Sequence, residues 1–155
     1  MLESVVVIDD ALPEKLIPSL ETYKDINWYD LEEDHPHKSF CLTVLHLAGQ
    51  YADLSEAIGY EFWCHNGTKP SWHYDKDEKL FTKEKKLDFP LCSIVYYAEV
   101  SKLRGGELIL ENDLVIVPKT NRLVIFKSGI YHTVKTYKGK RVSFLTNPWS
   151  HLLCQ

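Results

Sequence analysis

The sequence contains no apolar run approaching the length of about 18 residues that a membrane-spanning helix requires, which argues against an integral membrane protein. The stretch from Met1 to Ser4 lacks the basic start of a secretory signal peptide. No repeat, low-complexity segment or linker interrupts the 155 residues, a length typical of one domain. We therefore expect one cytoplasmic domain spanning residues 1–155.

Positive charge is also scarce. The chain has 18 Lys and Arg residues against 22 Asp and Glu residues, which gives a net charge of −4. Because nucleic-acid binding depends on a basic face that neutralises phosphates, nucleic acid is disfavoured as the main partner. Only three arginines occur, Arg104, Arg122 and Arg141, so the position of each carries information.

The four cysteines do not form a Cys-x-x-Cys pair. They are Cys41, Cys64, Cys92 and Cys154. Without a secretion signal, reduced thiols are the expected state. For Cys64 and Cys92, which fall in strand-like segments, we expect a packing role, because free cysteine is usually buried.

Most of the chain has the pattern of short β-strands. Apolar and β-branched segments alternate with turns rich in Gly, Pro and Asn-Asp. The expected strands are residues 4–8, a short one beginning at Trp28, and residues 60–65, 91–98, 107–110, 114–117, 122–126, 132–135 and 141–146. Short, evenly spaced strands in one domain predict a sandwich or a barrel.

Helical patterns are confined to the N-terminal part. Residues 9–20 predict a helix with Pro13 near its start and Pro18 as a kink or break. Residues 52–58 predict a second short helix that ends at Gly59.

Two histidines and one aspartate form the main candidate site. His73 and Asp75 lie two positions apart, so on a strand they would point to the same face, while His132 must come from elsewhere in the fold. Two imidazoles and one carboxylate can hold iron(II) and leave three coordination sites open, as in non-haem iron oxygenases. The alternative for the first pair is a surface position on a charged loop. His35 and His37 could also bind a metal, but their acidic loop favours solvent exposure.

Arg141 follows His132 by nine residues, far enough to lie on a neighbouring strand. Ser143 would share its face, so that a guanidinium and a hydroxyl could bind one carboxylate together. The planar fork of arginine matches a carboxylate in two places. The alternative is a surface charge among the lysines that precede Arg141.

Taken together, His73, Asp75, His132, Arg141 and Ser143 resemble the site of the 2-oxoglutarate and Fe(II)-dependent dioxygenases, most of all their prolyl-4-hydroxylase-like branch. Further similarity lies in residues 66–68, 94–97, 105–108 and 123–126. The resemblance covers about residues 59–149 and, more loosely, the N-terminal part.

The resemblance implies a mainly β fold, the double-stranded β-helix or cupin-like jelly-roll, with short N-terminal helices. Residues 59–149 would form its core and residues 1–58 would support it. His73, Asp75 and His132 would bind Fe(II), and the open sites would take 2-oxoglutarate and O2. Arg141 and Ser143 would bind the far carboxylate of 2-oxoglutarate.

Five aromatic residues are also expected to have roles. By resemblance, Tyr97 matches a tyrosine that binds the far carboxylate, and Tyr96 would then pack on the opposite face. Trp63 stands where the branch often has a tyrosine, and an indole can donate a hydrogen bond but cannot accept one. Trp72, beside the first metal histidine, is expected in the core, as is Tyr74 on its other side.

The leading interpretation is an enzyme that hydroxylates a C–H bond and releases succinate and CO2. Its substrate would be peptidyl, including prolyl, or a small molecule or nucleobase. The alternatives are a cupin-type metalloprotein that does not use 2-oxoglutarate, and a binding module on the same fold. Residues 76–88 are read equally well as a solvated loop or as a segment that caps the substrate.

Overall fold

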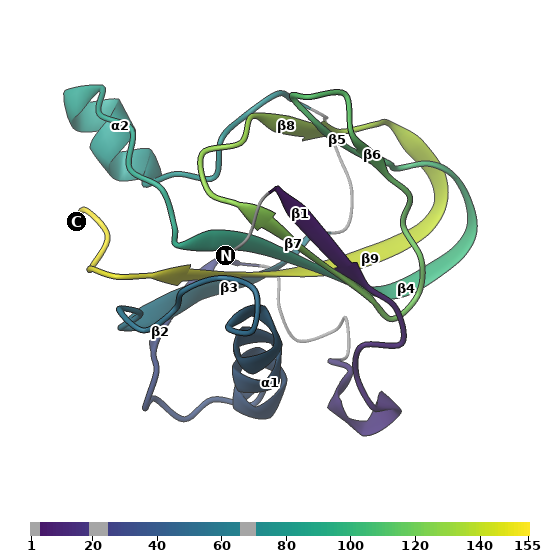
Figure 1. The fold of residues 1–155 in the computed structure, drawn as a ribbon, viewed down its shortest axis with the longest axis horizontal. Coiled ribbons are helices and arrows are strands. Elements are labelled where there is room, and N and C mark those ends of the chain that lie inside the picture. Colours follow the sequence, from purple (N-terminus) through teal and green to yellow (C-terminus); the bar gives the residue numbers. More distant parts are fainter. Residues whose placement is uncertain (1–3, 19–24, 66–70) are drawn as a thin grey trace.

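The computed structural model describes residues 4–18, 25–65 and 71–155 (Figure 1). Its strands are β1 (Val5–Ile8), β2 (Asn27–Asp30), β3 (Gly59–His65), β4 (Cys92–Gly105), β5 (Leu108–Leu110), β6 (Val115–Ile116), β7 (Arg122–Lys127), β8 (His132–Val134) and β9 (Tyr137–Trp149). They form a six-stranded sheet, in the order β1-β7-β4-β9-β3-β2, and a three-stranded sheet, in the order β6-β5-β8. The antiparallel pairing confirms the mainly β jelly-roll expected from the sequence.

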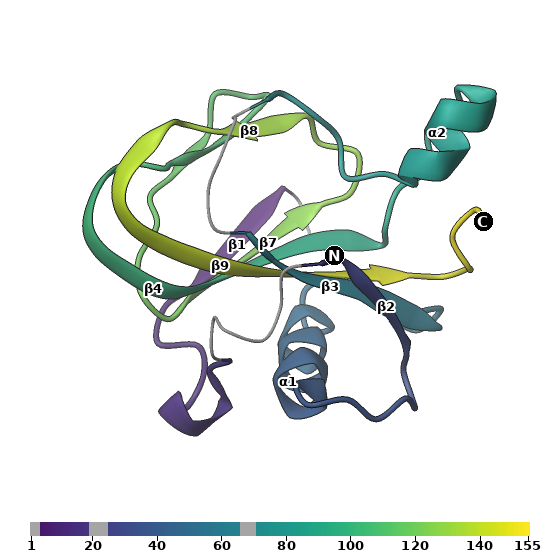
Figure 2. The same cartoon turned by 180° about the vertical axis from the view of Figure 1, so that it is seen from behind.

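The long strands β4 and β9 connect the two sheets. They pair from Val95 and Leu145 to Gly105 and Tyr137, with two shifts of register along the way. Such irregularities bend a strand pair and increase its twist. Figures 1 and 2 show both strands curving out of the large sheet toward the small one, so that the two sheets face each other.

Strand alternation divides the apolar side chains between two cores. On β4, Tyr96 packs into the core beneath the large sheet, whereas Val95 and Tyr97 pack between the two sheets. On β7, Ile125 belongs to the first core and Phe126 to the second. The expectation that the two tyrosines face opposite sides is confirmed.

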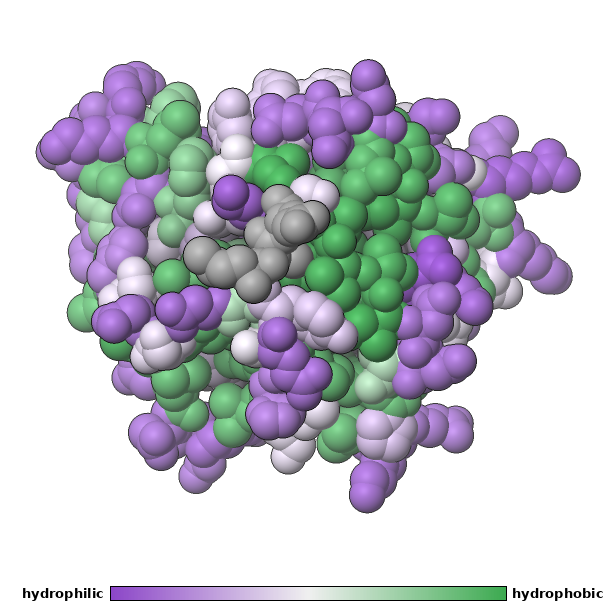
Figure 3. All heavy atoms as spheres, in the orientation of Figure 1, coloured by the Kyte–Doolittle hydropathy of each residue, from purple (hydrophilic) through white to green (hydrophobic). Residues whose placement is uncertain are grey.

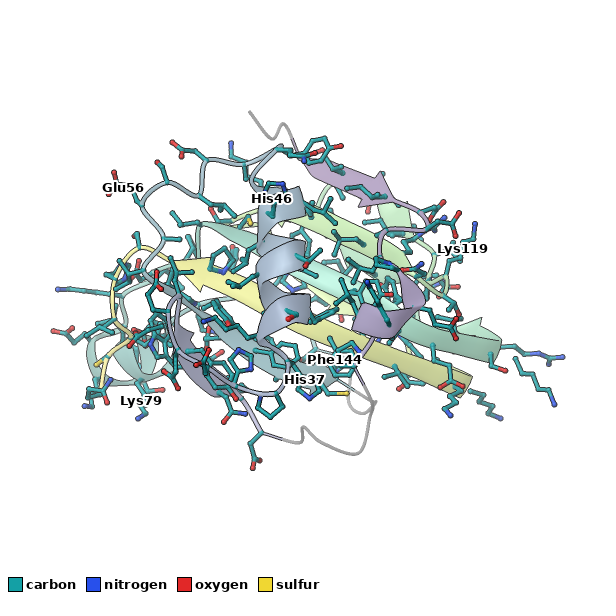
Figure 4. The ribbon with its side chains drawn as sticks, turned by 90° about the horizontal axis from the view of Figure 1, so that it is seen from below. His37, His46, Glu56, Lys79, Lys119 and Phe144 are labelled. Atoms are coloured by element: carbon teal, nitrogen blue, oxygen red, sulfur yellow. The ribbon has the colours of Figure 1, made fainter. Side chains whose placement is uncertain are left out.

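Helix α1 (Lys38–Ala48) covers the outer face of the large sheet, as Figure 4 shows from below. Its buried side chains are Phe40, Cys41, Val44, Leu45 and Ala48, a spacing that puts them on one side of the helix. Phe40 makes ring contacts with Phe62, Tyr96 and Phe144 of the sheet, with centroids 5.4–5.8 Å apart.

The two helices predicted near the N-terminus were wrong. In the described part of residues 9–20, only Glu14–Leu16 forms a single 3-10 turn, and Ile17 is already extended. A proline ring clashes with helical backbone at the preceding residue, which explains why the turn ends at Ile17, directly before Pro18. Residues 52–58 form turns that lead into β3, and the helix lies earlier, in α1.

His35 is not exposed as expected. Its ring stacks on Tyr29 with centroids 3.7 Å apart, and its Nε2 lies 2.6 Å from the hydroxyl of Tyr60. Burial lowers the pKa of His35, followed by the effect of nearby His37. The loop before α1 is therefore fixed to the sheet by a packed, neutral imidazole.

Residues 76–88 contain a helix, α2 (Glu78–Glu84), which the sequence analysis did not predict. Asp77 caps it by accepting a hydrogen bond from the backbone N–H of Leu80 at 3.0 Å. Hydrophilic side chains cover the outer side of α2 at the upper left of Figure 3. None of the helices in the described ranges is long and apolar enough to cross a membrane.

The cysteines are free thiols, as expected. Cys92 is fully buried, and half-buried Cys64 packs against the core under the large sheet. Cys41 is buried in α1, where burial raises the pKa of its thiol far above the usual range. A thiol held in its neutral form is a poor nucleophile, which fits a packing role.

Candidate metal centre and anion pocket

The structure brings His73, Asp75 and His132 together. The Nε2 atom of His73 lies 3.7 Å from Oδ1 of Asp75, and Nε2 of His132 lies 3.5 Å from the same oxygen. All three ligand atoms lie within 4.8 Å of one another. A strand was expected around His73, but the segment forms only a single β-bridge. In this bridge His73 and His132 exchange backbone hydrogen bonds of 2.9 and 3.0 Å.

Backbone carbonyls fix the imidazoles for metal binding. Nδ1 of His73 lies 2.8 Å from the carbonyl oxygen of Ser71, and Nδ1 of His132 lies 2.8 Å from that of Ile130. Because a carbonyl only accepts, each Nδ1 carries the proton, and each Nε2 turns its lone pair toward Asp75. Three acceptor atoms then converge on one point, an arrangement that a bound cation stabilises.

The second oxygen of Asp75 is held by two side chains. Its Oδ2 accepts a hydrogen bond of 2.6 Å from the Ser93 hydroxyl on β4 and one of 3.2 Å from the Asn147 amide on β9. The carbonyl oxygen of the Asn147 side chain accepts from the backbone N–H of Ile94 at 3.1 Å, which fixes the orientation of the amide. Oδ1 therefore remains the oxygen that points at both imidazoles. Sequence reasoning missed Ser93 and Asn147.

Asp75 and His132 attract each other when Nε2 of His132 is protonated, a state in which the proton occupies the place that a metal ion would take. Burial alone would raise the pKa of Asp75, but hydrogen bonding and charge from His132, together with the Ser93 hydrogen bond, hold it below its usual range. Burial alone would lower the pKa of His132, yet the Asp75 carboxylate raises it. A carboxylate that stays ionised in a dry site is the form that binds a metal ion.

A single cavity is lined by His73, Asp75 and His132 and also by Arg141. Arg141 is only 4% exposed, which excludes the alternative of a surface charge. Its Nε donates to the backbone oxygen of Gly106 at 3.2 Å, and one Nη donates to the Ser143 hydroxyl at 3.2 Å. The guanidinium also lies over the rings of Tyr97 and Tyr137, at 5.2 and 5.7 Å from their centroids. No carboxylate forms an ion pair with it among the described residues, so the pocket can accept an anion.

Tyr97 faces this anion pocket. Its hydroxyl is buried, and no hydrogen-bond partner for it lies within the described ranges. Burial raises the pKa of Tyr97, and nearby Arg141 offsets part of that rise. A buried hydroxyl without a partner is costly, so its position beside Arg141 fits a carboxylate ligand that accepts from both.

Trp63 lines the same cavity, as expected, and so does a residue that sequence reasoning missed, His65. Nδ1 of His65 lies 3.4 Å from an Nη atom of Arg141, and burial, then the charge of Arg141, lowers the pKa of this imidazole. A neutral His65 accepts from the guanidinium through Nδ1. The signal for it was available, because residues 63 and 65 share one face of a strand.

Apolar side chains close the cavity around the polar groups. The wall consists of Val95, Leu108, Phe126, Val134 and Leu145. Trp72 is 45% exposed and stacks on Tyr131 at 5.5 Å, so its expected core position was wrong. Tyr74 is half-buried and packs against the rings of Phe89 and Tyr131. Asn66-Gly67-Thr68, one of the similar stretches, lies outside the described residues.

The sequence profile of the 2OG-Fe(II) oxygenase superfamily matches residues 59–150, more than half of the chain. The chain belongs to this superfamily. It is therefore an oxygenase that uses Fe(II), 2-oxoglutarate and O2, and the His-Asp-His group fits metal binding. Among curated protein sequences, none matches the oxygenase significantly.

Solved structures of prolyl hydroxylases share the fold of this oxygenase. A Pseudomonas putida prolyl-4-hydroxylase is 16% identical, with a TM-score of 0.66 over 96% of this chain and 89% of the other. The viral collagen prolyl hydroxylase of Paramecium bursaria Chlorella virus-1 is 13% identical, with a TM-score of 0.61 over 95% and 96%. A Trichoplax adhaerens prolyl hydroxylase, solved with a hypoxia-inducible-factor peptide, is 14% identical, with a TM-score of 0.60 over 95% and 84%.

Proposed function

We propose that this oxygenase hydroxylates a C–H bond of a peptidyl substrate, with a prolyl residue as the first candidate, and releases succinate and CO2. In the balanced reaction, one oxygen atom of O2 enters the product hydroxyl and the other enters succinate. Iron and 2-oxoglutarate, when bound, supply the oxygen activation and the electrons that this chemistry requires. A small-molecule substrate is the second candidate. The peptide is preferred because the fold is that of prolyl hydroxylases, one of them solved with a peptide.

The single observation that carries the proposal is one cavity with two different ends. At one end, His73, Asp75 and His132 converge as three ligands for one ion. At the other end, Arg141 and Tyr97 are buried donors that lack an anionic partner among the described residues. A metal site beside a buried carboxylate receptor suits a chelating dicarboxylic acid such as 2-oxoglutarate. A cupin that does not use 2-oxoglutarate would not need the second end.

In this proposal the chain holds and orients its ligands. His73, Asp75 and His132 bind Fe(II), because their free Nε2 and Oδ1 atoms point to one place. Arg141, with Tyr97 at its side, binds the far carboxylate of 2-oxoglutarate. Ser143 orients the guanidinium through its 3.2 Å hydrogen bond, and Trp63 lines the wall of the same cavity.

The test replaces Arg141 by alanine and follows 2-oxoglutarate binding to the Fe(II)-loaded protein without oxygen, using the visible charge-transfer band expected of the complex. Loss of a buried charge pair costs roughly 2–5 kcal/mol, so affinity should fall about 30-fold or more, while iron binding persists. Exposed Lys135→Ala is the matched control and should change little.

Equal 2-oxoglutarate affinities for the wild type and Arg141→Ala would contradict the proposed role. If circular dichroism shows that this variant is unfolded, Arg141→Lys replaces it, since a lysine keeps the charge but loses the two-pronged geometry. Succinate formation with proline-containing peptides then tests the reaction. Succinate that appears without any hydroxylated peptide would favour the small-molecule candidate.

A further inference from the structure

A second cavity, of about 410 Å³, lies beside the catalytic one. It is open to solvent on one side and bordered by β2, β3, the start of α2 and the C-terminal segment that follows β9. Its lining residues are Ile26, Trp28, Glu61, Lys76, Asp77, Glu78, Lys79, Leu152, Leu153, Cys154 and Gln155. None of these residues belongs to the metal centre or the anion pocket.

The two cavities share one face of β3. Glu61, Trp63 and His65 alternate along this strand and therefore point the same way, and Trp63 and His65 line the catalytic cavity. Alternate residues of a strand are separated by about 7 Å. Glu61 is also paired in register with Asn147, whose amide holds Asp75. An extended molecule with one group at the metal centre can thus place another group beside Glu61.

Glu61 brings a carboxyl group to the wall of the second cavity. Its Oε1 accepts a hydrogen bond of 2.9 Å from the indole N–H of Trp149, and no other described residue donates to it. Burial raises the pKa of Glu61 to about 7, and the negative charges of Asp75, Asp77 and Glu78 add to the rise. The carboxyl group therefore lacks a countercharge and has one oxygen left for a ligand.

Three other charged groups of this cavity, Lys76, Asp77 and Glu78, already have partners. Lys76 lies 3.1 Å from Glu78 and over the ring of Phe81. The two oxygens of Asp77 accept from the backbone N–H groups of Leu80 and Cys154, at 3.0 and 2.7 Å. Lys79 lies on the exposed side of α2, near the C-terminal segment (Figure 4).

Apolar side chains make up the rest of the wall. Ile26 is 60% exposed and Leu152 is 64% exposed, although both border a cavity. The indole of Trp28 is fixed, because its N–H donates to Asp30 at 3.2 Å. A long aliphatic stem that ends in a cation would cover this apolar surface and bring a positive charge to Glu61.

We infer that the cavity at Glu61 binds the side chain of a lysyl or arginyl residue of the substrate peptide, two or three positions from the residue that is hydroxylated. The spacing is argued from β3: Glu61 lies about 7 Å along the strand from Trp63, which lines the catalytic cavity, and this separation equals roughly two residues of an extended peptide at about 3.3 Å each. This inference rests on the proposed peptide substrate. Glu61 would then determine which peptides the oxygenase prefers.

The first experiment measures the binding of fluorescein-labelled peptides to the protein loaded with Mn(II) and 2-oxoglutarate. Each peptide has a central proline, with lysine, norleucine or glutamate placed in turn at positions up to three residues on either side. We expect one or two lysine positions to bind about tenfold tighter than norleucine, as for a hydrogen-bonded charge pair, and glutamate to bind weakest. Glu61→Gln should remove the lysine preference. Exposed Glu56→Gln, on the loop after α1, removes the same charge elsewhere and should retain it.

A lysine preference that persists in Glu61→Gln, or equal binding of lysine and norleucine peptides, would overturn the inference while leaving the proposed hydroxylation intact. If no peptide binds, N-acetyl-lysine amide and N-acetyl-norleucine amide are titrated while the indole N–H signal of Trp28 is followed by NMR. A shift of that signal with the lysine compound alone, absent in Glu61→Gln, supports the site and contradicts only the peptide substrate. If the Trp28 signal does not shift with the lysine compound, the proposed site is contradicted.

Discussion

At the scale of single residues, the two oxygens of Asp75 have different surroundings. Oδ1 faces the two candidate metal-binding histidines, and Oδ2 faces the side chains of Ser93 and Asn147. Ser93 and Asn147 hold Oδ2, so the carboxylate cannot rotate to offer both oxygens to one ion. A single bound oxygen keeps coordination sites open for 2-oxoglutarate and O2. We therefore expect the site to depend on two residues outside the candidate ligand set, Ser93 and Asn147.

We expect Ser93→Ala to weaken binding of Mn(II) or Fe(II) about tenfold, because partners that orient metal ligands contribute on that order to affinity. The substitution removes one oxygen and leaves Asn147 in place, so the fold should persist. Calorimetric metal titration checks the prediction, with exposed Ser101→Ala, on the same strand, as the control. Unchanged affinity in Ser93→Ala would mean that Asn147 alone positions Asp75.

The two adjacent tyrosines should respond oppositely to loss of the hydroxyl. Tyr97→Phe should weaken 2-oxoglutarate binding by roughly 1.5–3 kcal/mol, as for a hydrogen bond to a charged group. Tyr96→Phe should leave that affinity unchanged and lower stability by about 1 kcal/mol, because its hydroxyl lies 2.6 Å from Asn121 beneath the sheet. Ligand titration and urea unfolding of both variants separate the two effects. A loss of 2-oxoglutarate affinity confined to Tyr96→Phe would refute the assignment.

At the scale of elements, α2 and the C-terminal segment depend on one side chain. Asp77 is 4% exposed, caps α2 through Leu80 and holds the backbone N–H of Cys154. A hydrogen bond between Nε2 of His151 and Asp88, at 2.5 Å, adds a further link. The segment that follows Asp75 therefore contains a helix fixed to the C-terminal segment, so the interpretation as a solvated loop was wrong, while substrate capping stays a prediction.

Asp77→Ala should destabilise the protein by about 2 kcal/mol, the sum of a lost helix cap and a second hydrogen bond. Hydrogen exchange should increase in residues 78–84 and 150–155, while β7 should stay protected. Asp77→Asn is the conservative comparison, because an amide keeps only one accepting oxygen. Its stability should lie between that of the wild type and that of Asp77→Ala. Exchange that increases equally in β7 would indicate global unfolding and contradict the local role.

At the scale of the whole molecule, stability should depend on the protonation of Glu61. Its pKa rises from 4.5 to about 7 on folding, mainly through burial. A raised carboxyl pKa means that the folded state binds the proton more tightly. Below about pH 4.5 both states are protonated and stability is unaffected, whereas between about 4.5 and 7 the unfolded state ionises first and stability falls. Above that range the penalty is constant, at about 3 kcal/mol.

Glu61→Gln should therefore lose less stability than the wild type when the pH rises from 5 to 8, by about 2–3 kcal/mol. Glutamine can still accept the hydrogen bond of Trp149 but carries no charge. Urea unfolding of the metal-free proteins at both pH values is the measurement, and Glu56→Gln should behave like the wild type. Parallel pH profiles for the wild type and Glu61→Gln would refute the assignment.

The sequence by itself predicted most of the β-strands, and it singled out the three residues that the structure brings together as a candidate metal site and the arginine that lies beside them. Strand alternation placed Tyr97 and Tyr96 on opposite faces, and the rarity of arginine singled out Arg141. These signals are local: a side-chain period of two, or an unusual residue at a defined distance along the chain. The helices were predicted less well, because 38–48 owes its helix to packing against Phe62 and Phe144 of the distant sheet.

Only the tertiary structure decided which residues support the site. Ser93 and Asn147 meet at Asp75 from β4 and β9, and His65 reaches Arg141 across 76 positions of sequence. Antiparallel register and the curvature of the long strands set these distances, and neither can be predicted from a short stretch of sequence. The cavity at Glu61 likewise exists because the C-terminal segment folds back onto α2. Pairing between distant segments, rather than local preference, therefore completed the site.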